Sequence, residues 1–539
     1  MPSSHHASLD TNTMKAGDRD EVTGIQTHMI TKACSPRLIS SPTVQSVSSN
    51  MEKLNDIEDQ PLSSLKPDKE NADFNENTRD MEDDDGLYAK DEYLDPPPDG
   101  GYGWVSCACV SLLNFATWGP NTSWGVFLSY FLSSNYFPGA TPTDFAIIGG
   151  LVIGLTLFLL PVVAAAMSLF GYKPTLAFAI VLEAVAFVAS SFVKSVGMLY
   201  FTYGVLLGIS FGIIFGSNTI VIPGWFLKKR ALANGFGHMG VGLGGLVFSF
   251  AVRAMIDRTG NHKWAMRMLA ASTFFLNIIS LCFIRVRKPR VPQAKKSVKE
   301  ILQQTFDRSV LKIVPLHLCM LWASFASIGY VILLFSMSNF ATSMGMTSQQ
   351  ATIALAVFNG SQAIGRPFMG WISEILGRCN ATILIMVYDL ILLLPFWLNI
   401  TKFSELVPFC FLLGFGVGVG SVNIVPLVSD VVGIQKFAAG IGYGLFGNGV
   451  VSIFAEVIGL HLRTPSSSRP YLHCQIFVAC MFFGGLLCLM PYRELKMRRV
   501  LAAKIRSSSS TEQQKRHYQE LLQNTVYNYI RRMFFLVKA

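Results

Sequence analysis

The sequence predicts an all-α membrane protein in which twelve transmembrane helices form two pseudo-symmetric bundles of six. Of its 539 residues, 51% are hydrophobic and only 14% are charged, whereas soluble globular chains carry roughly 25% charged residues. A helix needs about 20 mainly apolar residues to cross a bilayer, and segments of this kind recur from residue 104 onward. This composition excludes an ordinary soluble enzyme.

The chain opens with a polar, acidic segment. Residues 1–100 hold 9 Lys and Arg against 21 Asp and Glu, a net charge of −12. Residues 1–95 contain too little apolar sequence to offset the entropy of an ordered chain, so we expect a disordered cytoplasmic tail that could recruit an accessory protein. The other 439 residues carry a net charge of +22. Their basic residues lie in short connections between apolar runs, which favours contact with membrane lipids and argues against nucleic-acid binding.

Twelve apolar segments then follow, and each is bounded by polar or turn-forming residues. The first half, residues 96–285, contains 104–131, 145–169, 174–193, 196–222, 231–253 and 265–285. A basic cytoplasmic linker, residues 286–310, leads to the second half, residues 311–492, which contains 311–336, 348–372, 380–400, 405–428, 438–461 and 471–492. A basic cytoplasmic tail, residues 493–539, ends the chain, and its residues 515–535 form either an amphipathic helix on the membrane surface or a disordered segment.

The distribution of Lys and Arg predicts the orientation, because these residues concentrate in cytoplasmic connections. The connections before the third, fifth, ninth and eleventh helices carry Lys173, Lys228-Lys229-Arg230, Arg378 and Lys436. The opposite connections at 132–144 and 341–347 carry none, although the segment 253–267 departs from this pattern with four basic residues. We therefore expect both termini in the cytoplasm. The plasma membrane is the expected location, with a vacuolar or other organelle membrane as the alternative.

Acidic residues at matching positions indicate an internal repeat. Glu183 follows Gly171 by twelve residues in the third helix, and Asp389 follows Gly377 by twelve residues in the ninth. An internal repeat of this kind is typical of transporters built from two bundles. The two acids are candidates for proton coupling, and the alternative is a structural role between helices.

The sequence gives no sign of catalysis. The ten cysteines lack metal-ligand spacing, and no glycine-rich nucleotide loop follows a strand. No nucleophile and base stand in a recognisable motif. We therefore expect no enzyme activity, cofactor, metal or catalytic residue, and an integral-membrane enzyme is the weaker alternative.

Four motifs occur in order along the chain. They are Asp99-Gly100-Gly101-Tyr102-Gly103-Trp104, the stretch from Trp225 to Gly235, the stretch from Gly365 to Arg378, and the stretch from Ser429 to Phe437. On a frame of twelve helices, these motifs resemble those of the monocarboxylate porter family of the major facilitator superfamily. The resemblance covers about residues 96–492, and the long N-terminal segment is similar to that of fungal members.

The resemblance implies a secondary transporter that moves a small organic solute, such as a monocarboxylate or a related metabolite, by alternating access. It also implies that Arg366 binds the substrate. The chain departs from proton-coupled lactate carriers at two positions, with Asn121 in the region of their helix-one lysine and Gln362 in place of an aspartate. A larger or neutral solute such as riboflavin, facilitated diffusion, and coupling through a different acid all stay open. A transporter-like receptor without net flux is a further alternative.

Polar residues within the apolar segments are the candidates for the binding site. Arg366 lies well inside the eighth helix, where a guanidinium can bind a carboxylate through two hydrogen bonds. The other candidates are Asn114, Thr117, Asn121, Tyr330, Asn359 and Gln362. These side chains either face a polar cavity or join helices to one another.

We expect mainly structural roles for the remaining ionisable residues. Glu374 and Arg378 lie one helical turn apart and could latch one conformation, and Asp430 belongs to the fourth motif. His238 and His317 are expected to pack between helices. Glu456 is expected near the outer membrane interface, at the end of its helix.

Overall fold

The computed structural model describes residues 97–287, 297–433, 436–464, 467, 469–506 and 511–534. All of them belong to one of the chain's two compact units, which spans Asp80–Ala539. The predicted disordered tail over residues 1–95 lies outside the described residues. Within the described residues the secondary structure is helical and contains no strand, as the sequence predicts.

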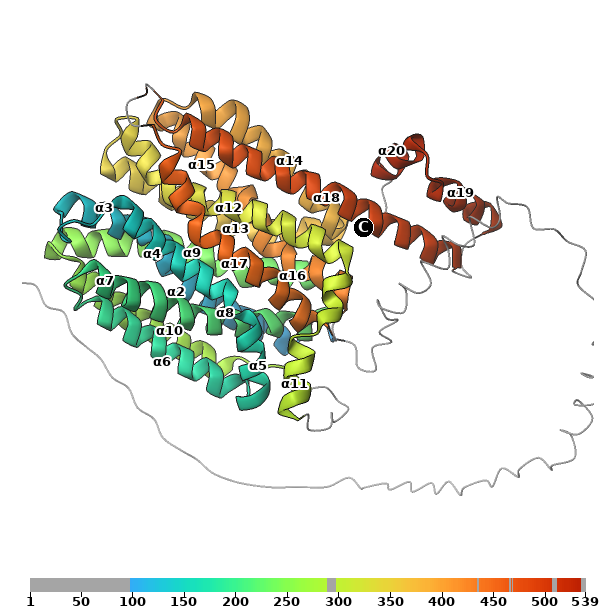
Figure 1. The fold of residues 1–539 in the computed structure, drawn as a ribbon, viewed down its shortest axis with the longest axis horizontal. Coiled ribbons are helices and arrows are strands. Elements are labelled where there is room, and N and C mark those ends of the chain that lie inside the picture. The colour runs from blue at the N-terminus through green and yellow to red at the C-terminus, as the bar shows by residue number, and fades with distance from the viewer. Residues whose placement is uncertain are drawn as a thin grey trace, which may run out of the picture. The chain divides into compact units, whose positions relative to one another are not determined.

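The first half contains six membrane-length rods, some of them interrupted (Figure 1). They are α2 (Tyr102–Thr122) with α3 (Trp124–Ser134), α4 (Pro142–Phe158) with α5 (Leu160–Phe170), α6 (Tyr172–Ser190), α7 (Val196–Leu199) with α8 (Leu207–Trp225), α9 (Arg230–Thr259) and α10 (His262–Phe283). A π-helical segment, Tyr200–Leu206, joins α7 to α8.

The second half repeats this arrangement. Its rods are α12 (Val314–Ser343), α13 (Ser348–Leu376), α14 (Arg378–Ile391), α15 (Phe403–Val417) with α16 (Val419–Val432), α17 (Phe437–His461) and α18 (Leu472–Arg506). Irregular helical turns extend α14 as far as Asn399.

Proline and glycine explain the main breaks in the rods. The bend of 51° between α4 and α5 falls beside Pro161, which lacks an N–H to continue the hydrogen-bond ladder. Pro120 precedes the break between α2 and α3, and Gly418 separates α15 from α16. The breaks lie close to Asn121, Leu157 and Gly418, which line the cavity described below.

Length and composition support the predicted membrane spans. In the described part of the chain, nine helices are long and apolar enough to cross a membrane, and ten if the bent pair α4 and α5 counts as one. The helices α2 and α13 are also long enough but less apolar. They contain Asn114 and Asn121, and Gln362 and Arg366, respectively. These two helices complete the twelve predicted segments.

The two basic regions contain more helix than the sequence analysis expected. The predicted linker contains α11 (Val298–Thr305) and a 3-10 turn over Arg308–Lys312. The last membrane rod, α18, continues past residue 492 to Arg506, because the segment that follows consists largely of strong helix formers. The tail beyond it forms α19 (Glu512–Leu522) and α20 (Val526–Phe534) rather than one continuous helix.

The helices of the tail are attached to α18 by a buried charge cluster. The Glu494 carboxylate accepts hydrogen bonds from Arg498 and Arg532, each at 2.8 Å. Arg532 is 1% exposed, so it has little contact with water. Its charge is stabilised instead by this carboxylate and by the backbone carbonyl of Gln523 at 3.2 Å.

The two halves contact each other mainly along two helix pairs, α9 with α13 and α4 with α17. Glycine permits both contacts. A Cβ atom added to Gly242 of α9 would lie 2.5 Å from the backbone nitrogen of Ala363. A Cβ atom added to Gly449 of α17 would lie 2.6 Å from the carbonyl oxygen of Gly154. The backbones of the two halves therefore meet closely on either side of the centre.

Candidate functional site

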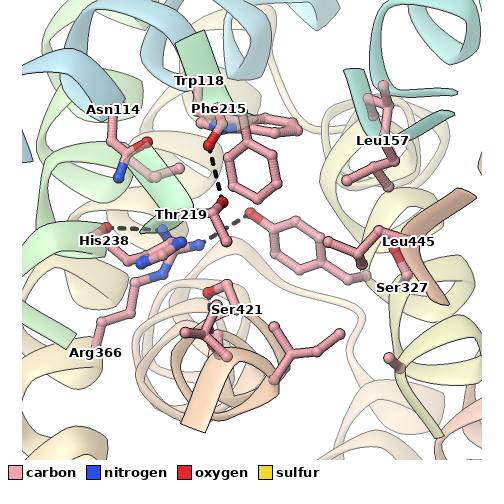
Figure 2. A pocket seen from close by; sticks show the side chains of 18 of the residues that line it. Asn114, Trp118, Leu157, Phe215, Thr219, His238, Ser327, Arg366, Ser421 and Leu445 are labelled. Carbon is pink, nitrogen blue, oxygen red and sulfur yellow. Dashed lines mark hydrogen bonds between the residues drawn. The ribbon is translucent and has the colours of Figure 1, made fainter. Parts of the chain in front are cut away.

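A central cavity lies between the two halves. Helices α2, α4, α8 and α9 line it from the first half, and α12, α13, α16 and α17 line it from the second. The cavity has a volume of about 160 Å³. Figure 2 shows Arg366 and His238 on one side and Leu157 and Leu445 on the other. One wall is thus polar and the other apolar, as in many small-molecule sites.

Arg366 is the only charged residue among those that line the cavity in the described chain, and it is 2% exposed. Its Nη1 donates to the carbonyl oxygen of His238 at 2.9 Å, and its Nη2 donates to Oε1 of Gln362 at 2.6 Å. A third, longer contact of 3.4 Å joins Nη2 to the hydroxyl of Tyr330. All these partners are neutral, and Nε has no hydrogen-bond partner among the described residues.

The contact with His238 links the halves at the cavity wall, since α9 carries His238 and α13 carries Arg366. The Nδ1 of His238 lies 3.0 Å from the carbonyl oxygen of Asn234, so this nitrogen carries a proton and donates it. Gly418 lies directly against Arg366, because an added Cβ would be 2.8 Å from the guanidinium Nε. The arginine is therefore held in place by neighbours from both halves.

The polar candidates from the sequence have different surroundings. Asn114, Asn121 and Tyr330 line the cavity together with Arg366. Asn114 donates to the carbonyl oxygen of Gly237 at 2.9 Å, whereas neither polar atom of the Asn121 side chain has a partner among the described residues. Because Asn121 is 1% exposed, its amide is a buried group that a bound solute could satisfy.

Three candidates lie behind the cavity wall. Gln362 holds Arg366 and receives a bond of 3.2 Å from Tyr330. Asn359 accepts from Gln362 at 3.4 Å and packs against Gly245 of α9. Thr117 donates to the carbonyl oxygen of Leu113 in its own helix. These three side chains position their neighbours or join helices.

The cavity also contains residues that the sequence analysis did not select. Trp118 and Phe215 meet edge to face, with ring centroids 5.6 Å apart. Asn218, Asn234 and Asn448 add amide groups to the lining. The asparagines interrupt apolar segments and could have been noticed in the sequence, whereas the two aromatic residues are indistinguishable there from residues that face lipid.

The two proton-coupling candidates lie away from the cavity. Glu183 of α6 accepts from Nδ2 of Asn277 in α10 at 2.7 Å. Asp389 of α14 packs against Gly416 of α15, and neither of its carboxylate oxygens has a partner among the described residues. Neither α6 nor α14 contributes a residue to the cavity lining.

Glu456 lies in the last turns of α17, which ends at His461, and its side chain is buried, with 1% of its surface exposed. Its expected place near the outer membrane interface stays a prediction. His317 is half-buried and bonds the carbonyl oxygen of Leu311 at 2.8 Å.

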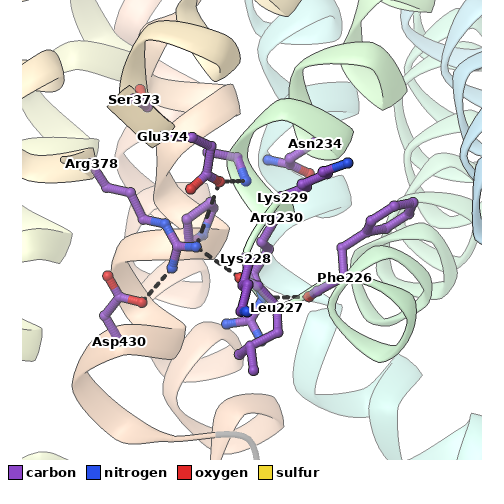
Figure 3. A network of polar contacts seen from close by, with 12 residues as sticks. Phe226, Leu227, Lys228, Lys229, Arg230, Asn234, Ser373, Glu374, Arg378 and Asp430 are labelled. Carbon is purple, nitrogen blue, oxygen red and sulfur yellow. Dashed lines mark hydrogen bonds and ion pairs between the residues drawn. The ribbon is translucent and has the colours of Figure 1, made fainter. Parts of the chain in front are cut away.

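A polar network closes one end of the helix bundle, which we call the basic end because it carries Lys228, Lys229, Arg230 and Arg378 (Figure 3). Arg378 bonds Oδ1 of Asp430 at 2.5 Å and the carbonyl oxygen of Leu227 at 3.0 Å. The Glu374 carboxylate lies 3.6 Å from Arg378.

Three of these contacts cross between the halves. The Leu227 carbonyl accepts from Arg378 of α14, Arg230 of α9 bonds the Ser429 hydroxyl at 2.5 Å, and the Glu374 carboxylate accepts from the backbone N–H of Ala231 at 2.5 Å. The network therefore joins the loop before α9 to α13, α14 and α16 beneath the cavity.

The loop before α9 is also fixed by the first motif. One carboxylate oxygen of Asp99 accepts hydrogen bonds from the backbone N–H groups of Leu227, Lys228 and Lys229, at 2.7, 2.8 and 3.2 Å. Asp99 has a positive φ of 54°, a conformation that aspartate adopts more often than most residues with a side chain. Two motifs far apart in the sequence thus form one structural unit.

Comparisons with known proteins agree with this architecture. The family model described as Major Facilitator Superfamily matches residues 106–456. The uncharacterized transporter ESBP6 of Saccharomyces cerevisiae is 36% identical over 75% of this chain and 61% of its own length, so the chain spans under two thirds of that relative. The probable transporter MCH2 of the same yeast is 32% identical over 78% of this chain and 88% of its own.

Two more distant proteins extend the comparison. Monocarboxylate transporter 10 of Danio rerio is 23% identical over 80% of this chain and 86% of its own length. The solved structure of the proton:xylose symporter XylE bound to 6-bromo-6-deoxy-D-glucose superposes with a TM-score of 0.51 at 15% identity, over 71% of this chain and 94% of that one. This last likeness shows the fold alone.

A multi-pass helical body with a cavity between two six-helix halves defines a membrane transporter for solutes. The chain belongs to the major facilitator superfamily, as a fungal-type member similar to the monocarboxylate transporters. Its relatives are transporters, which move solutes without making or breaking bonds, so the protein is not an enzyme.

Proposed function

We propose that this transporter carries a small organic anion, such as a monocarboxylate or a related metabolite, by alternating access of the central cavity. The observation that supports this most strongly is the position of Arg366. Its guanidinium lies at the cavity wall, is surrounded by neutral partners and retains an unpartnered Nε–H. Asn114, Asn121 and Tyr330 would orient the bound solute, and Gln362 and Asn359 would hold the arginine.

The charge of Arg366 favours an anion as the solute. A charged side chain at membrane depth costs roughly 2.5–3.5 kcal/mol on insertion scales, and dipoles of neutral groups offset only part of that cost. A solute carboxylate beside Arg366 would supply the opposite charge and a charge-assisted hydrogen bond. The printed name of the Danio rerio relative supports the same class of solute.

A neutral or larger solute, such as riboflavin, is the second candidate. The apolar wall with Leu157 and Leu445, and the aromatic pair Trp118 and Phe215, favour a solute with a sizeable flat or apolar part. A transporter-like receptor is a third candidate, which would bind solute without moving it.

A flux experiment with full-length protein in proteoliposomes distinguishes these candidates. Labelled lactate, phenylalanine and riboflavin are tested one by one, in exchange for the same unlabelled compound inside. We expect exchange of at least one carboxylate probe. Arg366→Ala should lower this exchange about 10- to 100-fold, since a hydrogen bond to a charged group is worth roughly 1.5–3 kcal/mol.

Arg253→Ala serves as the control, because Arg253 pairs with Asp257 on the surface at 2.9 Å. This variant should exchange the probe like the wild-type protein. Equal exchange in Arg366→Ala and wild type would remove Arg366 from the site. Exchange of riboflavin alone would favour the second candidate, and binding without exchange would favour the receptor.

We also propose that the protein lies in the plasma membrane with both termini in the cytoplasm. This rests on the basic connections, since Lys228, Lys229, Arg230 and Arg378 gather at one end of the bundle. Lipid headgroups would contact this end, and the long N-terminal segment would be available to a regulatory protein. Surface labelling of intact cells tests the location, and protein confined to internal membranes would contradict it.

A further inference from the structure

The cavity-lining helix α17 carries a buried acid outside the cavity. Glu456 is 1% exposed, and neither of its carboxylate oxygens has a hydrogen-bond partner among the described residues. An ionised carboxylate that is buried without a partner is costly. A carboxylic acid here is therefore most stable with a bound proton, and it requires an explanation that packing alone does not provide.

Polar side chains at successive turns of α17 lead from the cavity toward this acid, and the first two of them are hydrogen-bonded. Asn448 lines the cavity, and its Oδ1 accepts a hydrogen bond of 3.3 Å from the hydroxyl of Ser452. Glu456 lies four residues beyond Ser452, so the three side chains follow one face of α17 at successive turns. At 1.5 Å per residue, Glu456 is about 12 Å along the helix from Asn448.

The groups packed around Glu456 are mostly uncharged. On α12 the nearest neighbours of this face are Ile332 and Ser336, which lie within van der Waals distance of a Cβ added to Gly459. On the side of α18, the neutral side chains of Tyr471 and Cys474 lie near Glu456.

Arg463 lies on this side with its guanidinium 5.5 Å from the centre of the Tyr471 ring. His461 and His473 of the same region bond the Val457 carbonyl and the Thr464 hydroxyl, respectively. On α4, which packs against another face of α17, the acid is Asp144. Its carboxylate is engaged with Thr141 at 2.8 Å and Tyr200 at 3.1 Å. No described cation therefore forms a salt bridge with Glu456, and a proton is the simplest counter-charge.

We infer that Glu456 is the proton-binding group that couples proton movement to solute transport through Ser452 and Asn448. This inference rests on the proposed function. With Glu456 protonated, Ser452 donates to Asn448, as observed. When the carboxyl group releases its proton to water on the side to which the cavity is open, the Ser452 hydroxyl turns to donate to the new carboxylate.

This turn changes the cavity wall. The Asn448 Oδ1 then loses its donor and is free to accept a hydrogen bond from a solute, so proton binding and solute binding influence each other. A proton site at Glu456 would replace titratable residues that this chain lacks. Where lactate carriers have such residues, the chain has Gln362 and Asn121, whose side chains do not titrate near neutral pH.

Glu456→Gln tests the inference, because glutamine keeps the shape of the neutral acid but cannot exchange a proton. A pH gradient is imposed across the membrane of the proteoliposomes. The probe is whichever of lactate, phenylalanine and riboflavin exchanged in the preceding experiment. Wild-type protein should accumulate this probe, by up to about tenfold per pH unit for one proton per solute. Glu456→Gln should lose the accumulation and retain exchange of labelled for unlabelled probe.

Glu183→Gln and Asp389→Asn are the matched controls, since each removes a buried acid from a helix, α6 or α14, that contributes no residue to the cavity lining, whereas α17 contributes Asn448. Both should still accumulate the probe. Ser452→Ala keeps Glu456 and removes its link to Asn448, so this variant should accumulate less probe while downhill flux continues. It also keeps the inference falsifiable if Glu456→Gln fails to assemble.

Infrared spectroscopy of the full-length protein in lipid vesicles gives a second measurement that needs no solute. The carbonyl band of protonated, non-hydrogen-bonded carboxylic acids should lose intensity in Glu456→Gln relative to the wild type, while the contribution of Asp389, which also lacks a hydrogen-bond partner among the described residues, remains. Accumulation by Glu456→Gln equal to wild type, or an unchanged band, would overturn the inference. Wild-type flux without any accumulation would overturn it and leave the proposed function standing, whereas no flux of any probe would contradict both.

Discussion

At the scale of single residues, the site combines one arginine with amides that lack full hydrogen bonding. Arg366 was the leading candidate in the sequence because a charge inside an apolar helix demands a reason. The structure places Arg366 at the cavity wall, in agreement with that reasoning. Which of the surrounding polar side chains face the cavity was not predictable, because Thr117 and Asn121 lie one turn apart on nearly the same face of α2. Only the packed structure shows that Thr117 bonds its own helix whereas Asn121 lines the cavity.

Asn121 provides a prediction that separates binding from structure. Asn121→Leu removes an amide without protein partners, so Tm should stay equal or rise. Exchange of the transported probe should fall about 2- to 12-fold, which is the loss of a hydrogen bond worth roughly 0.5–1.5 kcal/mol. Thermal melting and the proteoliposome exchange measure the two effects.

Asn277→Leu is the matched control, because Asn277 donates to the buried Glu183 at 2.7 Å. This variant should lower Tm and change exchange less than Asn121→Leu does. A lower Tm together with unchanged exchange in Asn121→Leu would assign Asn121 to helix packing.

At the scale of helices, the apolar segments predicted the number and order of the rods well, because burial in lipid requires length and apolarity together. Their internal details depend on tertiary contacts. The π-helical turns after Tyr200 and the division of the tail into α19 and α20 have no clear counterpart in hydropathy. The extension of α18 to Arg506 was missed because its last turns are helical but polar.

The contact of α4 with α17 gives a prediction at this scale. Gly154→Val places side-chain atoms against Ile453 and within 2.9 Å of the carbonyl oxygen of Gly449 at its Cβ. Overpacking of this kind costs about 1–3 kcal/mol, so Tm should fall and exchange should slow as the halves are forced apart. Gly447→Val on α17 is the control, since no atom lies within 4 Å of its added Cβ. Equal behaviour of the two variants would show that this close approach is not needed.

At the scale of the whole molecule, the network at the basic end holds the halves together beneath the cavity. The sequence predicted that Glu374 and Arg378 lie one turn apart and that Asp430 belongs to a motif. It could not predict that Arg378 also bonds the Leu227 carbonyl of the other half, since that requires both halves in place. The role of this network as a latch stays a proposal.

Arg378→Gln tests the latch, because it removes a charged donor from a contact between the halves. With a charged hydrogen bond worth about 1.5–3 kcal/mol, the population open at the basic end should increase at least tenfold. Spin labels on Lys229→Cys and Ile375→Cys, one in each half, would report this as a longer separation.

Lys496→Gln is the control for the latch. Lys496 bonds Oδ2 of Asp430 at 3.0 Å, and both residues belong to the second half. This variant should leave the distribution of distances unchanged. An unchanged distribution in Arg378→Gln would mean that other contacts keep this end closed.

The modest hydropathy of α2 has a consequence for biogenesis. Its asparagines serve the finished cavity, but they make it one of the two long helices too polar to qualify as a span by composition. Ribosomes produce α2 well before α9, the helix against which much of its surface finally packs. Until α9 arrives, α2 must reside in the insertion machinery or in lipid with its amides unshielded, so the polarity needed for transport makes the early stage of synthesis the most dependent on assistance.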